Sequence, residues 1–473
     1  MVSLLPTATS RPRKSGFRIG VTCPSCGGEL ELQDDFFVLT CSHCESVLRI
    51  IMPDTPPAFL VRRKVSQREA LFQLDRYCRE QGLPFVSGPS VNQVSCPYWK
   101  FDAVALKVRH TTYEVEQVEG EETYDAGQTE EREFKAINLV PVTVTRLAID
   151  ELPGVPASLG LRTDYLKMVP YAQESAEADT TYYAVALAPQ AVQASAFKGL
   201  VEAGRIDYVN ASRNKTELFS PVASIIHFPY FRVDSISSHG IHTFYIDGVT
   251  GKVAGHAEQN PDAPIELFQS SPSVVEFGAL KVTLHRCGNC GVDLPVTRSL
   301  VYQCHNCERI SFLDHHQLQQ PELQSTQSID SGDAVLPFWS LKLDPKDRSG
   351  LRKMFGGIKE SDRIMIPAFR LRNTEAMYRL TKRMSAAAAR MEFQDMPALS
   401  PRSAAVTVPL RDALTAVEVL WQRDLAGREM RSNIDSGFKP VSAQLTFVPF
   451  AQEQYFYVDS ILHAVTFETG ALA

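Results

Sequence analysis

The sequence predicts an α+β protein made of two related halves, each with an antiparallel sheet and helices. Two observations carry this prediction. Eight of the ten cysteines fall into two similar blocks far apart in the chain, and the same order of motifs follows each block. Some segments space their apolar residues as helices do and others as strands do, which indicates both kinds of element. The 473 residues exceed one ordinary core, so we expect about two to four domains.

The composition argues against several classes of protein. Apolar residues make up 44% of the chain and charged residues 22%, which is near the globular average and argues against wholesale disorder. A net charge of −7 argues against a surface coated in basic charge for nucleic acid. The sequence lacks an apolar run of the roughly 18 residues that would span a bilayer, and residues 1–14 lack the pattern of a secretory signal. We therefore expect a soluble cytoplasmic protein.

Eight cysteines form two blocks of paired C-x2-C motifs. The two pairs are separated by 14 residues in the first block and by 13 in the second. This spacing brings four thiolates around one tetrahedral Zn²⁺. Because four thiolates close the coordination shell, the two expected zinc ions are structural and not catalytic. The predicted ligands are Cys23, Cys26, Cys41, Cys44, Cys287, Cys290, Cys304 and Cys307.

Other uses of these cysteines stay open at this point. Disulfides need an oxidising compartment, and the chain shows no export signal that would take it there. An iron–sulfur or rubredoxin-like iron site uses the same four thiolates as zinc does. His43, His285 and His305 lie beside the cysteines, and we interpret them as surplus to the coordination shell.

The two cysteine blocks, with short β-prone stretches at 29–40 and 292–303 between their pairs, resemble the zinc-ribbon superfamily. That superfamily is seen in transcription factor IIB, in some helicases and in many bacterial proteins. The chain also resembles poorly characterised bacterial proteins in which duplicated ribbons precede aromatic-rich α+β domains, through Pro97-Tyr98-Trp99 and Pro337-Phe338-Trp339. The resemblance implies a ribbon fold and bound zinc. It implies no activity, since ribbons serve as nucleic-acid, protein and purely structural modules.

The same signals follow both cysteine blocks in the same order. They are a Pro-aromatic-Trp strand, a strand containing proline, a helix entered at proline, an aromatic strand and a closing turn. They fall at 97–99, 137–145, 189–205, 226–231 and 249–251 in the first half, and at 337–339, 364–370, 409–428, 445–450 and 468–470 in the second. This order indicates an internal duplication. The expected fold is therefore two zinc ribbons, each followed by a related domain with an antiparallel sheet and helices.

The first half carries an additional helix between its ribbon and its sheet. Ser66 and Glu69 form a capping-box pattern, and Gly82 is typical of a helix end. Leu74 and Cys78 share one helical face, so we expect Cys78 to be a core residue and not a reactive thiol.

Changes in composition suggest the domain boundaries. We expect a tail, two ribbons, two larger domains and two connecting segments, of which the second is rich in Gln, Ser and Asp. The boundaries are 1–17 for a flexible basic tail, 18–52 for ribbon 1, 53–256 for domain 1, 257–280 for a linker, 281–312 for ribbon 2, 313–333 for a polar linker and 334–473 for domain 2.

Two charged segments compete for a functional interpretation. Residues 114–133 contain nine acids and one Arg, which fits two strands around a solvated acidic loop or a docking site for a basic partner. Residues 342–390 contain thirteen Lys or Arg against five Asp or Glu. In a predicted helix there, Met377, Leu380 and Met384 form an apolar face. The opposite face is a candidate site for an anionic partner, and its basic residues are Arg379, Lys382, Arg383 and Arg390.

The sequence favours a non-enzymatic zinc-binding scaffold or adaptor that acts through protein–protein contacts. The alternative is a nucleic-acid-binding accessory factor that uses the ribbons and the basic segment 342–390, and an anionic membrane surface is a further ligand for that segment. An enzyme is disfavoured because the chain has no nucleophile elbow, dinucleotide fingerprint, kinase motifs or H-E-x-x-H.

Overall fold

The computed structural model describes most of the chain in a series of ranges. The described residues are 18–32, 38–51, 55–83, 89–116, 129–149, 152–159, 163, 166–171, 177, 179–203, 215–237, 240–259, 273, 275–278, 280–314, 317–326, 333–342, 344, 362–372, 374–425, 440–463 and 465–472. Residues 1–17, expected to form a basic tail, lie outside them, as do 117–128 of the acidic segment and 345–361 of the basic segment.

The prediction of a duplicated α+β fold is wrong, because the chain folds mostly as sheet. Among the described residues, strand accounts for 46% and helix for 18%, with four helices. The two large sheets differ in size, with ten strands in one and seven in the other. Matched short motifs do not determine how far a strand continues. Strand β6 has 27 residues, whereas β18, which carries the second Pro-aromatic-Trp motif, has nine.

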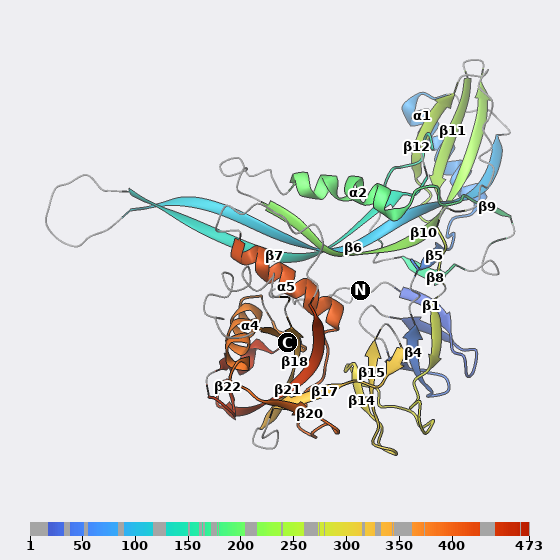
Figure 1. Ribbon diagram of the computed structural model, residues 1–473. Coiled ribbons are helices and arrows are strands. Elements are labelled where there is room, and N and C mark those ends of the chain that lie inside the picture. The colour runs from blue at the N-terminus through green and yellow to red at the C-terminus, as the bar shows by residue number, and fades with distance from the viewer. Residues whose placement is uncertain are drawn as a thin grey trace.

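The larger sheet contains the strands of the first half together with two strands of the first ribbon (Figure 1). Its central path runs β12-β11-β10-β5-β8-β1-β2, and β6, β7 and β9 branch from it. The strands are β1 (Arg18–Thr22), β2 (Glu29–Leu32), β5 (Ala58–Val61), β6 (Ser90–Glu116), β7 (Thr129–Leu147), β8 (Lys167–Pro170), β9 (Thr180–Tyr182), β10 (Lys215–Ser237), β11 (Gly240–Asp247) and β12 (Val253–Gln259).

Strand β6 organises this sheet because it pairs antiparallel with both β10 and β7. The Trp99 side chain is fully buried, and its indole Nε1 donates a hydrogen bond of 2.7 Å to the Leu187 carbonyl. Helix α2 (Pro189–Ala203) follows that carbonyl and contributes Val192 and Phe197 to the same apolar cluster as Trp99. The helix is thereby fixed over one face of the sheet (Figure 1).

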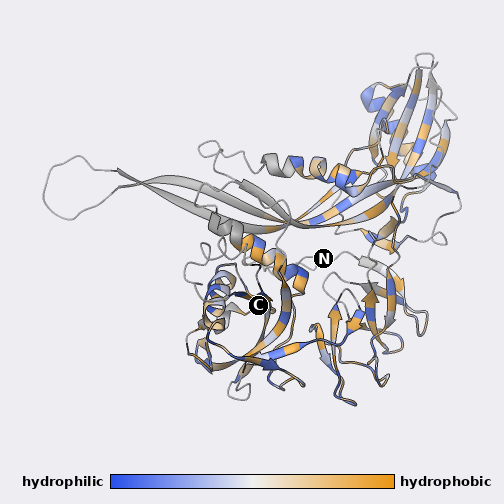
Figure 2. Ribbon diagram, in the orientation of Figure 1, coloured by the Kyte–Doolittle hydropathy of each residue, from blue (hydrophilic) through white to orange (hydrophobic). Residues whose placement is uncertain are grey.

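Helix α1 (Gln67–Gln81) confirms the capping prediction. The Ser66 side chain accepts from the Glu69 amide, the Glu69 side chain accepts from the Ser66 amide, and Gly82 ends the helix at a φ of 66°. The helix carries mostly hydrophilic residues (Figure 2) and buries Leu74 and Cys78 against the hairpin of β11 and β12. Cys78 is thus a core residue, as expected.

The smaller sheet contains the strands of the second half in the order β19-β18-β21-β17-β20, with β22 and β23 extending from β21. Its strands are β17 (Leu323–Thr326), β18 (Ala334–Lys342), β19 (Arg363–Pro367), β20 (Phe393–Asp395), β21 (Ser442–Glu453), β22 (Phe456–Asp459) and β23 (Thr466–Glu468). Helices α4 (Thr374–Ala388) and α5 (Leu410–Leu425) pack on it, and the short 3-10 helix η4 (Thr469–Ala471) follows β23.

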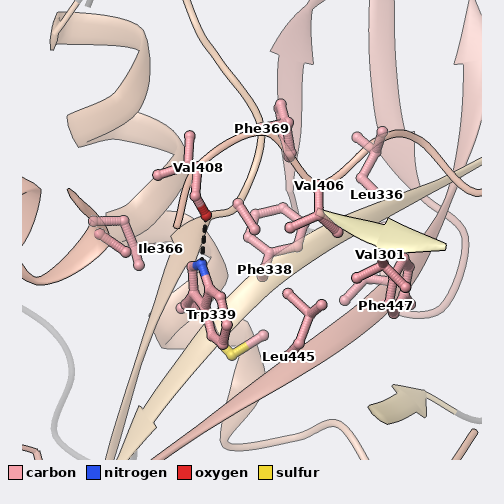
Figure 3. Close-up of a cluster of buried hydrophobic side chains, with 14 of the residues drawn as sticks. Val301, Leu336, Phe338, Trp339, Ile366, Phe369, Val406, Val408, Leu445 and Phe447 are labelled. Carbon is pink, nitrogen blue, oxygen red and sulfur yellow. Dashed lines mark hydrogen bonds between the residues drawn. The ribbon is translucent and has the colours of Figure 1, made fainter. Parts of the chain in front are cut away.

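The core beneath this sheet centres on Trp339, whose Nε1 donates a hydrogen bond of 2.8 Å to the Val408 carbonyl (Figure 3). The bond resembles the one that Trp99 makes in the larger sheet. Val301, from the second cysteine-containing segment, belongs to the same cluster as Leu336 and the other side chains of Figure 3. The second ribbon is therefore attached to this half through packing as well as through the chain.

Two small sheets complete the fold. One has the order β13-β4-β3 and the other β14-β15-β16. Their strands are β3 (Val38–Thr40), β4 (Val47–Ile51), β13 (Lys281–Leu284), β14 (Val301–Gln303), β15 (Ile310–Asp314) and β16 (Gln317–Gln319).

The segments expected to be linkers contain strands where they are described. Strand β12 runs to Gln259, beyond the expected end of the first domain at 256. Strands β16 and β17 lie within 313–333, and Thr326 in β17 is fully buried. None of the helices in the described ranges is long and apolar enough to cross a membrane.

Candidate metal centres

The first cysteine block, ribbon 1, is built on β1 to β4. Each C-x2-C pair lies in a tight turn that joins or ends these strands. In the first turn the Gly27 amide donates to the Cys23 carbonyl at 2.8 Å, and in the second the Glu45 amide donates to the Cys41 carbonyl at 2.9 Å. The residue after each pair has a positive φ, 73° at Gly27 and 61° at Glu45. This left-handed residue reverses the chain so that both sulfurs of a pair face the same point.

The second block, ribbon 2, repeats this geometry between β13 and β15. The Gly291 amide donates to the Cys287 carbonyl at 2.9 Å, and the Glu308 amide donates to the Cys304 carbonyl at 2.8 Å. Gly291 and Glu308 again take positive φ values, 76° and 58°. A non-glycine residue is uncommon in this conformation, so its recurrence in both second turns indicates a shared local constraint.

The sulfur positions distinguish a metal site from disulfides. All four sulfurs within each block lie within 4.8 Å of one another. Two of the S···S distances in ribbon 1 are 3.7 Å for Cys23–Cys44 and 3.8 Å for Cys26–Cys41. In ribbon 2 the corresponding two are 3.6 Å for Cys287–Cys307 and 3.5 Å for Cys290–Cys304. A disulfide requires about 2.05 Å. A tetrahedron with Zn–S bonds of about 2.3 Å has S···S edges of about 3.8 Å, so the two groups fit a tetrahedral ion of this size.

Hydrogen bonds favour the thiolate that a metal needs at one cysteine of each block, whereas the neighbouring sulfurs raise the pKa of Cys26 and of Cys304 despite backbone hydrogen bonds that lower it. The hydroxyl and backbone of Ser46 lower the pKa of Cys44 from 9.0 to about 6, and the Ser46 Oγ lies 3.3 Å from the sulfur. The Val292 backbone and the Asn306 side chain lower the pKa of Cys290 to about 6 as well. Each block therefore has one cysteine that is ionised at neutral pH before any ion binds.

The three neighbouring histidines do not join the sulfur groups, because the four-membered groups found in the described residues consist of cysteines alone. His305 is exposed. His285 is fully buried with its ring edge against Tyr302, 4.5 Å between centroids. Burial lowers the pKa of His285 to about 4, so its ring is neutral at pH 7.

A feature that the sequence did not reveal is that the two ribbons share a sheet. Strand β13, which leads into ribbon 2, pairs antiparallel with β4 of ribbon 1 from Lys281↔Ile51 to Leu284↔Leu48. The His285 amide extends this pairing with a hydrogen bond of 2.8 Å to the Val47 carbonyl. Nothing in the local spacing of either block indicates a partner more than two hundred residues away.

The two ribbons are also joined by apolar clusters that contain residues of both. Buried Cys23 and Cys41 belong to a cluster against which Val282 and Leu284 of β13 pack. Val38 of ribbon 1 belongs instead to the large core that contains Cys287 of ribbon 2. Each ribbon therefore has part of its apolar support in a segment that belongs to the other.

The basic candidate residues lie on or just after α4. Met377, Leu380 and Met384 are buried, which confirms the predicted apolar face of this helix. Arg379 donates to Glu375 at 2.7 Å.

Arg383 donates to the Thr466 carbonyl on β23 at 2.6 Å. Lys382 is half-buried, and Arg390 is exposed after the end of the helix. Two of the four cations are thus engaged with the chain's own groups.

The arrangement provides two sets of four sulfurs, each able to hold one metal ion. In ribbon 1 the outer cysteines, Cys26 and Cys44, are exposed while Cys23 and Cys41 are buried. An ion held in either set would link the two turns of its ribbon at the edge of the fold. No protein-family model, curated protein or solved structure matches the chain.

Proposed function

We propose that this protein is a non-enzymatic scaffold stabilised by two structural Zn²⁺ ions, one in each group of four cysteines. The observation that carries the proposal is that the four sulfurs of each group lie within 4.8 Å of one another, with two S···S distances per group of 3.5–3.8 Å, an arrangement that suits tetrahedral zinc. Four sulfurs fill the coordination shell and leave no position for water or substrate. Iron in a four-thiolate site is the competing metal, and elemental analysis separates the two.

Bound zinc would supply the stabilisation that the ribbons cannot obtain from apolar contacts of their own. The strands β1 to β4 have three to five residues each, which is too few to build a core of their own. A structural ion adds about 10–16 kcal/mol of binding free energy to a small module of this kind. Because β13 pairs with β4, zinc in ribbon 1 would also order the strand that leads into ribbon 2.

The scaffold part of the proposal rests on the outer portion of β6 and β7, residues 109–116 and 129–136, here called the arm. The third strand of this region, β10, pairs with β6 as far as Val108, and beyond that point β6 and β7 pair only with each other, to Glu116↔Thr129, in the described residues. Figure 1 shows the arm running out from the rest of the molecule. A two-stranded ribbon is marginal in water, and its open edges can pair with another strand.

The sequence of the arm suggests the kind of protein that it contacts. The described end of the arm, residues 114–116 and 129–133, holds five acids and one Arg, so it would attract a basic surface. A nucleic acid would be repelled by it. Helix α4 also gives less support to the alternative function in nucleic-acid binding, because its Arg379 and Arg383 already contact Glu375 and Thr466.

The test is to isolate the partner of the full chain and of a variant with a shortened arm. Val108 and Ile137 are directly opposite in the register, so a two-residue Asn-Gly turn can replace residues 109–136 without disturbing the inner pairing. The tagged proteins are expressed in the source cell, purified under reducing conditions, and analysed by mass spectrometry of the co-eluting proteins and by absorbance at 260 nm.

We expect a stoichiometric basic protein to co-elute with the full chain and to be lost from the shortened variant, with the zinc content unchanged. The absence of any stoichiometric protein would contradict the scaffold. Nucleic acid that co-elutes at low salt and dissociates steeply as salt is added would favour the accessory factor.

A further inference from the structure

A cleft of about 580 Å³ lies where the end of β7, the loop 152–157 and the first turns of α2 meet. It is unconnected with the metal centres, since no cysteine lines it. Its walls are mostly apolar and include Leu147, Leu152, Val155, Leu187 and Val192. The volume is in the range of sites that bind small molecules, which are usually apolar hollows with a few polar groups.

Backbone hydrogen bonds hold the walls of this cleft in place. The loop wall is tied to β7 by the Leu147 amide, which donates to the Ala157 carbonyl at 2.8 Å, and is closed on itself by the Val155 amide, which donates to Leu152 at 3.1 Å. On the other side, the Leu187 amide donates to the Ala148 carbonyl at 3.0 Å. A ligand would therefore meet a preformed site and would not have to order a loop.

The loop wall also packs closely against β12, at a contact between two glycines. Gly154 has a φ of 82°, and a Cβ added to Gly255 of β12 would lie 1.9 Å from the Gly154 carbonyl oxygen. Only glycine at 255 allows β12 to approach the loop so closely. This contact fixes the position of the loop against β12.

Arg146 is the one charged residue among those that line the cleft. It lies opposite Trp99 in the β6–β7 register, so the two side chains project from the same face of the sheet, the face that α2 covers. Arg146 is half-buried and has no ion pair or side-chain hydrogen bond with any residue in the described ranges. A guanidinium beside an apolar hollow is a binding group for an anion with an apolar body.

We propose that this cleft binds a small amphipathic carboxylic acid of the fatty-acid type. The carboxylate pairs with Arg146, and the hydrocarbon lies against Leu152, Val155 and Val192. A carboxylate matches the single positive charge of the site, whereas a phosphate monoester dianion would leave one charge uncompensated in a mostly apolar cleft. The Ser195 hydroxyl, which also lines the cleft, is already directed to the Val192 carbonyl at 2.9 Å and leaves Arg146 as the anchor.

The test uses isothermal titration of the full zinc-loaded chain with sodium decanoate and with neutral decanamide. The variants are Arg146→Gln, which removes the charge, and Ala191→Phe, which narrows the cleft from an exposed helical position. The matched control is Arg62→Gln, an exposed arginine outside the cleft. Circular dichroism and zinc content verify the fold of each variant.

We expect one decanoate per chain, with affinity at least about tenfold weaker for Arg146→Gln and for Ala191→Phe and unchanged for Arg62→Gln. Decanamide should bind the wild type about as weakly as decanoate binds Arg146→Gln. Absence of decanoate binding, or equal binding by wild type and Arg146→Gln, would overturn the proposal. A peptide with a free C-terminal leucine that binds more tightly than decanoate would contradict the assignment to a free acid.

Discussion

The position of its sulfur decides what each cysteine of this chain can do. The eight cysteines of the ribbons lie in tight turns with their sulfurs grouped. Cys78 and Cys96 lie instead on a helix and in a strand, each at most 1% exposed. Burial raises the pKa of both thiols, so they are protonated at neutral pH and act as apolar core groups.

Replacing one ligand of either ribbon should release its zinc. Cys26→Ser and Cys290→Ser each remove one of four sulfur ligands. The binding free energy of zinc, about 10–16 kcal/mol in a structural site, should therefore fall by a large part. We expect about one zinc per chain for each variant by elemental analysis. The control Cys78→Ser should retain two and cost only about 1–2 kcal/mol of unfolding free energy for a buried hydroxyl. Zinc loss from Cys78→Ser would refute the ligand assignment.

The pH dependence of zinc binding should depend on Ser46. Because the pKa of Cys44 is lowered from 9.0 to about 6, its thiolate prevails at pH 7 and is lost as the pH falls through 6. Ser46→Ala removes the hydroxyl that is the main cause of this shift. Proton competition at Cys44 should then begin at higher pH.

The measurement for Ser46→Ala is chelator competition between pH 5 and 9, followed separately for the two ribbons. The zinc affinity of ribbon 1 at pH 7 should fall and become more pH-dependent between pH 6 and 8. Ribbon 2, in which Cys290 has different hydrogen-bond partners, is the internal control. A parallel change in both ribbons, or no change in ribbon 1, would show that the Ser46 hydroxyl does not set the pKa.

Helix α4 shows which features of a helix an amphipathic pattern predicts and which it does not. The pattern correctly gave the buried face of Met377, Leu380 and Met384. It could not give the partners of the basic face, because these depend on β23, which lies about eighty residues further along the chain. The arginines of one helix therefore have different structural roles.

Truncating two of these arginines should separate the roles. Arg383→Ala removes hydrogen bonds to the carbonyl and hydroxyl of Thr466, so we expect the free energy of unfolding to fall by about 1 kcal/mol. Arg379→Ala removes an exposed pair with Glu375 one turn away and should cost about 0.3 kcal/mol. Urea denaturation of both variants measures this difference. Equal costs, or a larger cost at Arg379, would mean that α4 is not docked through Arg383.

In the molecule as a whole, β4 and β13 connect the two groups of four cysteines. The four register pairs between them include Thr283↔Arg49 and Leu284↔Leu48. A ribbon that loses its metal should therefore loosen a strand that belongs to the other half of the sequence. This coupling distinguishes the structure from two independent zinc modules on one chain.

Hydrogen exchange measures the coupling. In Cys26→Ser, amides of β13 should exchange faster than in the wild type, because their partners on β4 have lost the support of zinc. Amides of β22, which pair only with β21 and β23 among the described strands, should be unchanged and serve as the control. Unchanged protection of β13 after loss of zinc from ribbon 1 would mean that the ribbons fold independently.

The sequence predicted what depends on neighbours in the chain. The capped helix at Ser66–Gly82, the turn at 249–251 and the grouping of the cysteines all follow from short spacings. It did not predict what depends on distant partners. The 27 residues of β6, the pairing of β4 with β13 and the cleft at Arg146 each require segments that are far apart in sequence.

The expected duplication failed for the same reason. Trp99 and Trp339 make similar hydrogen bonds, to Leu187 and Val408, because the residues around each motif determine that contact. The lengths of the surrounding strands are determined by long-range pairing, and β10 has 23 residues where β21 has 12. Similar motifs were therefore compatible with two different sheets.

If both groups of four sulfurs bind zinc at the same time, the metal content of the intact chain will show it. The full protein is purified with its thiols reduced and without chelator, and its mass is measured under native and denaturing conditions beside elemental analysis. We expect two zinc ions per chain, with the native mass exceeding the denatured mass by two zinc ions less the displaced protons. Iron in place of zinc, a single ion per chain, or fully reduced thiols without any metal would contradict this expectation.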